Sequence, residues 1–209
     1  MDNPKCKICR RLGLKLFLKG DRCFSPKCAM IKRPYPPGQK AKRKSKALSE
    51  YGKELAEKQK MKNWYNLRER QFAKYVREAL DKRSKNEDAG ALLFKKLESR
   101  LDSVVFRMGF ASSRVQASQE VGHGHFLVNG KKIDAPSYHA KKGDKISISP
   151  FSAKKAPFQN LTAVLKKYNP PSWIKIDPEK LEGELIKDAN MEEASFPIEV
   201  SSIFEFYSK

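Results

Sequence analysis

The sequence has no run of about 18 apolar residues, so no membrane-spanning segment is expected. Its N-terminus, MDNPKCKICRR, also lacks the apolar core of a signal peptide. Acidic residues are scarce, because 24 Asp and Glu stand against 44 Lys and Arg, which gives a net charge of +20. These features predict a cytoplasmic protein with no membrane contact and a polyanionic partner.

Sequence patterns typical of enzymes are absent as well. There is no phosphate-binding G-x-x-x-x-G-K-S/T loop, no Ser/His/Asp order and no arrangement of paired carboxylates. We therefore expect no catalytic residues and no small-molecule substrate.

Cysteine is limited to four residues, and all of them lie within 23 positions: Cys6, Cys9, Cys23 and Cys28. In a reducing compartment, two close pairs separated by a loop indicate a four-thiolate metal site rather than disulfides. The metal would fold a segment that has too few apolar residues to form its own core. Zn²⁺ is the expected ion. Spacing alone leaves a [4Fe-4S] cluster open, and the alternative is four reduced structural cysteines.

Positive charge is concentrated at the front of the chain. Residues 1–50 carry a net charge of +12, whereas residues 151–209 carry −1. Arg10 and Arg11 follow the first cysteine pair and can offset the charge of the thiolates while facing RNA phosphates.

A second cationic segment follows a proline-rich run, Arg33 to Gln39, which is expected to be extended. Residues 40–46 (KAKRKSK) then supply five candidate RNA-binding residues: Lys40, Lys42, Arg43, Lys44 and Lys46. A nuclear-localisation signal has the same composition, but the neighbouring features favour RNA contact.

Helices are predicted next. Ser49 is a suitable N-cap for a helix from Glu50 to about Lys62. A second helix is expected from Arg68 to Arg83, with Arg70 on its polar side and available to RNA. Leu92, Leu93 and Leu97 indicate a third helix.

The stretch from Arg100 to Ile148 has the clearest internal pattern. Leu101, Val104, Val105 and Met108 predict one helix, and Ser112 or Ser113 can cap a second helix that ends at Gly122. The period then changes to that of strands, with Asn129-Gly130 as a tight hairpin turn and a third strand from Lys145 to Ser149. This predicts two helices packed on a small antiparallel sheet.

Basic and polar residues of this stretch are candidates for a strip that binds phosphates on shaped RNA. The alternative is a solvated rim. The candidates are Arg100, Arg107, Ser113, Arg114, His123, Asn129, Lys131 and Lys132, with His125 nearby.

The C-terminal residues are acidic and apolar. Leu161 to Tyr168 predicts a helix, Trp173 to Ile176 an extended piece, and Phe196 to Tyr207 a strand followed by a short helix. We expect a C-terminal segment of this composition to pack back on the helices of the N-terminal half. The expected fold is thus α+β in four parts: a cysteine knuckle with its basic extension (1–47), a helical domain (48–98), an inserted RNA-binding module (99–160), and a part packing back on the helical domain (161–209).

Several motifs carry a family resemblance. S-R-L-D-S-V-V-F-R-M-G-F, S-S-R-V-Q-A, H-F-L-V-N-G-K-K-I and K-G-D-K-I resemble the RNA-binding domain named after ribosomal protein S-four. The cysteine quartet, P-Y-P-P-G-Q, E-R-Q-F, L-L-F-K-K-L-E-S-R-L-D and the closing E-F-Y-S-K extend the resemblance to the bacterial S-four family of small-subunit ribosomal proteins, in its four-cysteine form. The match is weakest from Ser152 to Asp188.

The resemblance implies a primary rRNA-binding protein that grips a multi-helix junction in the 5′ domain and starts its assembly. It also implies that Lys42, Arg43, Lys44 and Lys46 lie where messenger RNA enters the subunit. Contact with ribosomal protein S-five, an influence on decoding accuracy and repression of its own messenger are further properties of family members.

Two other classes compete with this interpretation. Pseudouridine synthases join the same module to a catalytic domain with a G-R-L-D motif, of which Ser99-Arg100-Leu101-Asp102 imitates three letters. However, Asp102 opens the module itself, and we expect it to pair with an arginine or cap its helix. A metal-dependent transcription regulator would explain the cysteines and the charge, but not the module.

Overall fold

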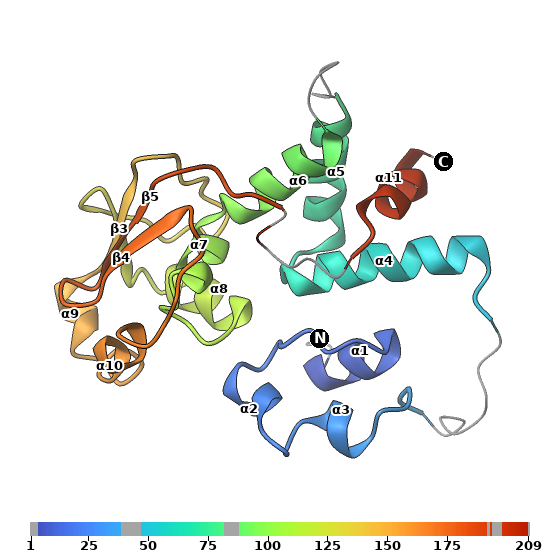
Figure 1. Ribbon diagram of the computed structural model, residues 1–209, viewed down its shortest axis with the longest axis horizontal. Coiled ribbons are helices and arrows are strands. Elements are labelled where there is room, and N and C mark those ends of the chain that lie inside the picture. Colours follow the sequence, from blue (N-terminus) through green and yellow to red (C-terminus); the bar gives the residue numbers. More distant parts are fainter. Residues whose placement is uncertain (1–3, 39–46, 82–87, 192, 194–197, 209) are drawn as a thin grey trace. The chain divides into compact units, whose positions relative to one another are not determined.

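The chain is described by a computed structural model that covers residues 4–38, 47–81, 88–191, 193 and 198–208. It divides into two compact units, one made of residues 1–90 and 197–209 and the other of residues 91–196 (Figure 1). The second unit is therefore inserted between two segments of the first. No helix in the described ranges is long and apolar enough to cross a membrane.

The first unit is helical. Its N-terminal segment holds α1 (Lys5–Leu12), α2 (Asp21–Phe24) and α3 (Ala29–Lys32), and two longer helices follow, α4 (Glu50–Trp64) and α5 (Glu69–Asp81). Ser49 caps α4 as expected, because its side chain accepts a hydrogen bond from the Gly52 N–H. A small core of Cys9, Leu16 and Leu18 includes Trp64 from the end of α4 among its neighbours.

The C-terminal helix α11 (Val200–Ser208) packs on α4 and α5 within the first unit. Lys58 of α4 lies over the Phe206 ring at 4.2 Å and forms an ion pair with Glu69 at 2.8 Å. Glu69 also accepts hydrogen bonds from Lys62 and from the Tyr207 hydroxyl, at 2.9 and 2.8 Å. The closing residues of the chain thus complete the helical unit.

Helix α6 (Ala89–Glu98) leads into the second unit, where α7 (Leu101–Arg107) and α8 (Arg114–Gly122) pack against each other. The strands of this unit are β1 (Phe126–Val128), β2 (Lys131–Lys132), β3 (Lys145–Ile148), β4 (Ile174–Asp177) and β5 (Glu182–Leu185), with short helices α9 (Pro150–Ala153) and α10 (Leu161–Leu165) between β3 and β4. They form one antiparallel sheet in the order β2-β1-β3-β5-β4.

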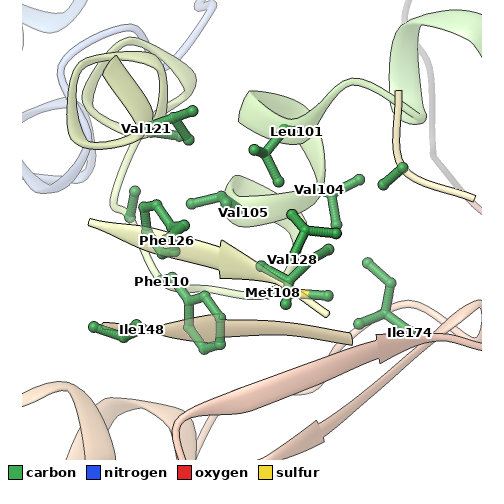
Figure 2. Packing of buried hydrophobic residues seen from close by; sticks show 14 of the residues in the cluster. Leu101, Val104, Val105, Met108, Phe110, Val121, Phe126, Val128, Ile148 and Ile174 are labelled. Atoms are coloured by element: carbon green, nitrogen blue, oxygen red, sulfur yellow. The ribbon is translucent and has the colours of Figure 1, made fainter. Parts of the chain in front are cut away.

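The core of the second unit lies between the helices and the sheet (Figure 2). Leu101, Val104 and Val105 of α7 and Met108, which follows the helix, face Phe126 and Val128 of β1. The helical spacing of the first four and the alternation along the strand predict this packing. Asn129 and Gly130 have φ values of 50° and 78°, which is the backbone that the tight hairpin requires. The prediction of an α+β module with a small antiparallel sheet is therefore confirmed.

Buried ion pairs tie α6, α7 and α8 together. The Glu98 carboxylate accepts hydrogen bonds from Arg107 at 2.8 and 3.0 Å and from Arg114 at 3.0 Å, and its side chain is fully buried. Arg100 makes two hydrogen bonds to Asp102, at 3.0 and 2.7 Å, and Asp102 also accepts the Ser103 N–H. Asp102 thus pairs with an arginine, as expected, and its carboxylate also satisfies a backbone N–H in the first turn of α7, whose N-cap is Arg100.

The C-terminal residues differ from the prediction in two ways. The expected part 161–209 is divided between the units, because β5 pairs with the edge of β3 and Trp173, Ile174 and Leu185 enter the core of the second unit. The strand expected near Phe196 lies partly outside the described residues, and the described part from Val200 is a helix, in which Val200 and Ile203 share the buried side.

Replacing Glu98 by Gln should strongly destabilise the second unit. The substitution keeps the shape of the side chain but leaves two guanidinium groups without their buried carboxylate. We expect the free energy of unfolding to fall by about 3–5 kcal/mol, measured by urea denaturation. Glu179→Gln, in the exposed turn after β4, is the control and should change it by less than about 0.5 kcal/mol. Equal losses in the two variants would contradict the role of Glu98.

Replacing Glu69 by Gln should loosen α11 in a pH-dependent way. Burial alone would raise the pKa of Glu69, but hydrogen bonds from Lys58, Lys62 and Tyr207 lower it to about 2 from 4.5. A depressed pKa stabilises the fold above pH 4.5, and this contribution is lost as the pH falls toward 2. Because the Glu69 side chain is 46% exposed, we expect a loss of at most about 1 kcal/mol at pH 7.

Urea denaturation of the wild type and of Glu69→Gln at several pH values checks this expectation. The difference between them should close between pH 4.5 and about 2. Glu205→Gln, on the exposed side of α11, should show no such closing. A difference that persists at pH 2 would mean that the carboxylate is not its source.

Candidate RNA-binding surface and cysteine cluster

The four cysteines line one pocket in the first unit, together with Lys15, Leu18 and Met30. Cys6 and Cys9 come from α1, Cys23 from α2, and Cys28 precedes α3. Cys9, Cys23 and Cys28 are buried, and Cys6 is half-buried. The Lys19 N–H donates a hydrogen bond to the Cys23 sulfur at 3.4 Å. The arrangement therefore gathers four sulfur donors in one place, with a backbone donor turned toward one of them.

Packing the thiols together disfavours their ionised form. Burial raises the pKa of the Cys9 thiol; a backbone hydrogen bond from Leu16 opposes this, and the three other cysteines add to the rise. Among the His, Cys, Asp and Glu side chains in the described ranges, the group whose ligand atoms lie within 4.8 Å of one another is Glu120, His123 and His125, not the cysteines. The four cysteine sulfurs line the same pocket but do not all lie within 4.8 Å of one another.

The cations of the first unit have different surroundings. The Arg10 guanidinium donates to the Tyr35 carbonyl at 2.9 Å and lies over the Tyr35 ring, so it holds the proline-rich run against α1. Arg11 on α1 and Arg70 on α5 are exposed. Lys40, Lys42, Arg43, Lys44 and Lys46 fall outside the described residues.

The arginines expected to form a strip of donors in the module do not form one. Arg100 and Arg114 are 3% and 7% exposed, and both they and Arg107 are engaged by buried carboxylates. Ser113 is buried as the N-cap of α8, where it accepts the Gln116 N–H. Sequence reasoning placed these residues on the polar edge because it could not see that Glu98 and Asp102 are their partners.

Lysines supply the exposed charge of the module. Lys131 and Lys132 form β2 at the edge of the sheet, and both are exposed. Asn129 holds the neighbouring turn, since its side chain donates to Asp144 at 2.8 Å and accepts the Lys145 N–H at 3.0 Å. Lys145 is exposed and alternates with the core residue Ile146, so it lies on the sheet face away from the core.

The Lys132 side chain also passes over Gly124 so closely that its Cε leaves no room for a Cβ atom there. This places a lysine beside the turn of His123 and His125. His123 is exposed and His125 is buried. Burial lowers the pKa of His125, and the positive charge of Lys155 adds to this.

The structure adds cations that the sequence prediction left out. Within residues 91–170, 14 Lys and Arg stand against 5 Asp and Glu, and four further lysines of this range are exposed next to the sheet or on the segment that follows it: Lys141, Lys142, Lys154 and Lys155. The sequence pattern that could have identified them is the pairing of lysines, at a turn for Lys141 and Lys142 and just after a short helix for Lys154 and Lys155. The β4–β5 segment, by contrast, is rich in acidic residues.

Comparison with known proteins identifies both parts of the chain. The model of the ribosomal protein S4/S9 N-terminal domain matches residues 1–98, and that of the S4 domain matches residues 99–146. Small ribosomal subunit protein uS4 from Kosmotoga olearia is 46% identical over 206 residues, which cover 99% of this chain and 97% of that protein.

Other relatives give the same result. The protein named uS4 from Thermus thermophilus is 41% identical with the same coverage, and uS4A from Alkaliphilus oremlandii is 48% identical over 98% of this chain and 96% of its own length. A pseudouridine synthase is excluded, because the residues before the module belong to the ribosomal N-terminal domain. The chain therefore belongs to the family of small ribosomal subunit protein uS4, which is a structural and non-enzymatic component of the ribosome.

Proposed function

We propose that this protein is a primary rRNA-binding component of the cytoplasmic small ribosomal subunit, and that it nucleates assembly of the 5′ domain by gripping a multi-helix junction. The exposed lysines around the β1–β2 hairpin and β3 are the observation that supports this best. They lie on strands whose apolar side chains pack in the core of the second unit. A fixed array of charges suits folded RNA, which proteins recognise largely by its shape and backbone.

The basic run of residues 40–46 has a second role in this proposal. It follows the proline-rich segment, in which the Tyr35 and Pro36 carbonyls accept hydrogen bonds from Arg10. We place Lys42, Arg43, Lys44 and Lys46 where messenger RNA enters the subunit, and Lys40 beside the rRNA. Contact with ribosomal protein S-five and an influence on decoding accuracy belong to the same proposal, and cross-linking within isolated subunits tests the protein contact.

The cysteine pocket is proposed to hold Zn²⁺ through Cys6, Cys9, Cys23 and Cys28. Four sulfur donors in one pocket match the number and type of ligands that structural zinc takes, and the Lys19 N–H is placed to hydrogen-bond a metal-bound thiolate. The surrounding core consists of Cys9, Leu16 and Leu18 with a few half-buried side chains, so this segment gains much of its stability from the ion. The ion has a structural role, and a [4Fe-4S] cluster is the alternative occupant.

Alanine substitutions in the hairpin and in the basic run should separate rRNA binding from messenger handling. Lys131→Ala with Lys132→Ala should weaken binding to the junction rRNA, because two phosphate contacts and their released counterions are lost. We expect the slope of log affinity against log salt to fall by about one for each lysine. Lys42→Ala, Arg43→Ala and Lys44→Ala together should impair the handling of structured messenger by assembled subunits more than junction affinity.

Filter binding at several salt concentrations and messenger unwinding by reconstituted subunits are the two measurements. Lys175→Ala with Lys180→Ala removes the same charge from the β4–β5 segment and should leave both nearly unchanged. If this control weakens rRNA binding as much as the hairpin variant does, the binding surface has been misplaced. If the variant of Lys42, Arg43 and Lys44 lost more rRNA affinity than messenger handling, the messenger assignment would be overturned.

Replacing Cys9 by Ser should release the metal and loosen the cysteine segment up to about residue 35. The module from Arg100 to Ile148 should stay folded, because its core shares no residue with that segment. Elemental analysis and an absorption spectrum of the purified protein distinguish zinc from iron, and hydrogen exchange locates the loosened residues.

Lys27→Ala, an exposed change between the second pair of cysteines, should retain the metal in full. Equal loss of protection in the cysteine segment and in the module would contradict the independent folding of the two. Protein purified without zinc or iron, and unable to take up either, would remove the metal site itself.

A further inference from the structure

A second group of metal-type ligands lies at the end of α8, away from the cysteines in the sequence. Glu120 is in the last turn of the helix, His123 follows the helix, and His125 precedes β1. The ligand atoms of the three side chains all lie within 4.8 Å of one another. Glu120 and His125 are 8% and 7% exposed, whereas His123 is open to solvent. Two of the ligands are thus held in place by burial, and the third can adjust.

The spacing of the buried pair suits an ion between them. His125 Nε2 lies 3.4 Å from Glu120 Oε2. That distance exceeds the usual 2.7–3.2 Å of an N–H···O hydrogen bond. A tetrahedral ion with bonds of about 2.0–2.1 Å separates its ligand atoms by roughly 3.3 Å, which is close to the observed distance.

A hydrogen bond on the other ring nitrogen orients His125. Its Nδ1 lies 2.9 Å from the Ser152 hydroxyl oxygen, and Ser152 is buried. When Nδ1 carries the proton and donates it to Ser152, Nε2 keeps its lone pair for a metal ion. Metal-binding histidines are commonly held by such a second hydrogen bond, which fixes the ring and the tautomer.

We infer that Glu120, His123 and His125 form a binding site for a divalent transition-metal ion of the zinc class. One carboxylate and two imidazoles are ligands that such ions accept. Because His123 is exposed, the fourth position opens to solvent and can hold a water molecule. The site is distinct from the cysteine pocket.

Two neighbouring cations oppose binding and set its strength. Lys155 and Lys132 act electrostatically on His125, and the Lys132 side chain passes over Gly124. Both lysines are exposed, so their charged ends can turn into water. Removing Lys132 should therefore tighten metal binding, which is the opposite of its effect on rRNA binding.

Zn²⁺ titration of the full-length protein by calorimetry, without RNA, tests the inference. The chain has three histidines, so His139→Ala is the matched control. His139 is exposed and its Nδ1 lies near the Ser99 hydroxyl, outside the cluster. Since these variants all keep the four cysteines, any difference between them reports on the histidine site alone.

We expect the wild type and His139→Ala to bind one more Zn²⁺ than His123→Ala does, or to bind it at least tenfold more tightly. Ser152→Ala should weaken this ion by about tenfold through loss of the ring orientation. Lys132→Ala should strengthen it. Glu120→Gln should behave like His123→Ala, with circular dichroism to show that it is folded.

The His123 variant decides the outcome even if Glu120→Gln does not fold, because His123 is exposed. Equal stoichiometry and affinity in the wild type and His123→Ala would overturn the inference. So would an equal loss in His139→Ala. Neither result would affect the rRNA proposal, whose measurements use no added metal.

Discussion

The Glu98 carboxylate is the constraint on which the second unit depends. It is fully buried at the end of α6 and accepts hydrogen bonds from Arg107 of α7 and Arg114 of α8, so one charge fixes the ends of three helices. A buried carboxylate is tolerated only when it is paired and hydrogen-bonded, and the two guanidinium groups satisfy it. The orientation of α7 and α8 over the sheet, and hence the place of the hairpin, follows from this arrangement.

Much of the second unit could be predicted from the sequence, because its signals are local. The apolar spacing of α7, the Ser113 cap and the Asn129-Gly130 turn each act over a few residues, and each has the expected structure. The gathering of the four cysteines in one pocket was likewise predictable from their spacing. Local chemistry is enough to predict these features without knowledge of long-range packing.

Features that depend on distant partners could not be predicted. The strand β5 contains Gly183, which packs so close to Met108 that a Cβ atom would lie 2.6 Å from its sulfur, and its sequence gives a weak strand signal. Arg107 and Arg114 find Glu98 from 9 and 16 residues away, which no helical or strand period reveals. The exposed or buried state of an arginine is thus set by tertiary structure, and the candidate site shifts from arginines to lysines.

This division of the cations has a consequence for recognition. The second unit contains three arginines, and all three are bound to buried carboxylates, with Arg107 and Arg114 also over the rings of Trp173 and Phe106. The planar guanidinium of arginine can form bidentate hydrogen bonds with a carboxylate, whereas the ammonium of lysine is a strongly hydrated point charge. The surface is therefore left to lysines. In the proposed rRNA-binding role, these lysines would contact phosphates without reading base edges in pairs. Such a module would select its RNA by where the phosphates lie, so we expect the spacing of the lysines on the sheet to provide the specificity.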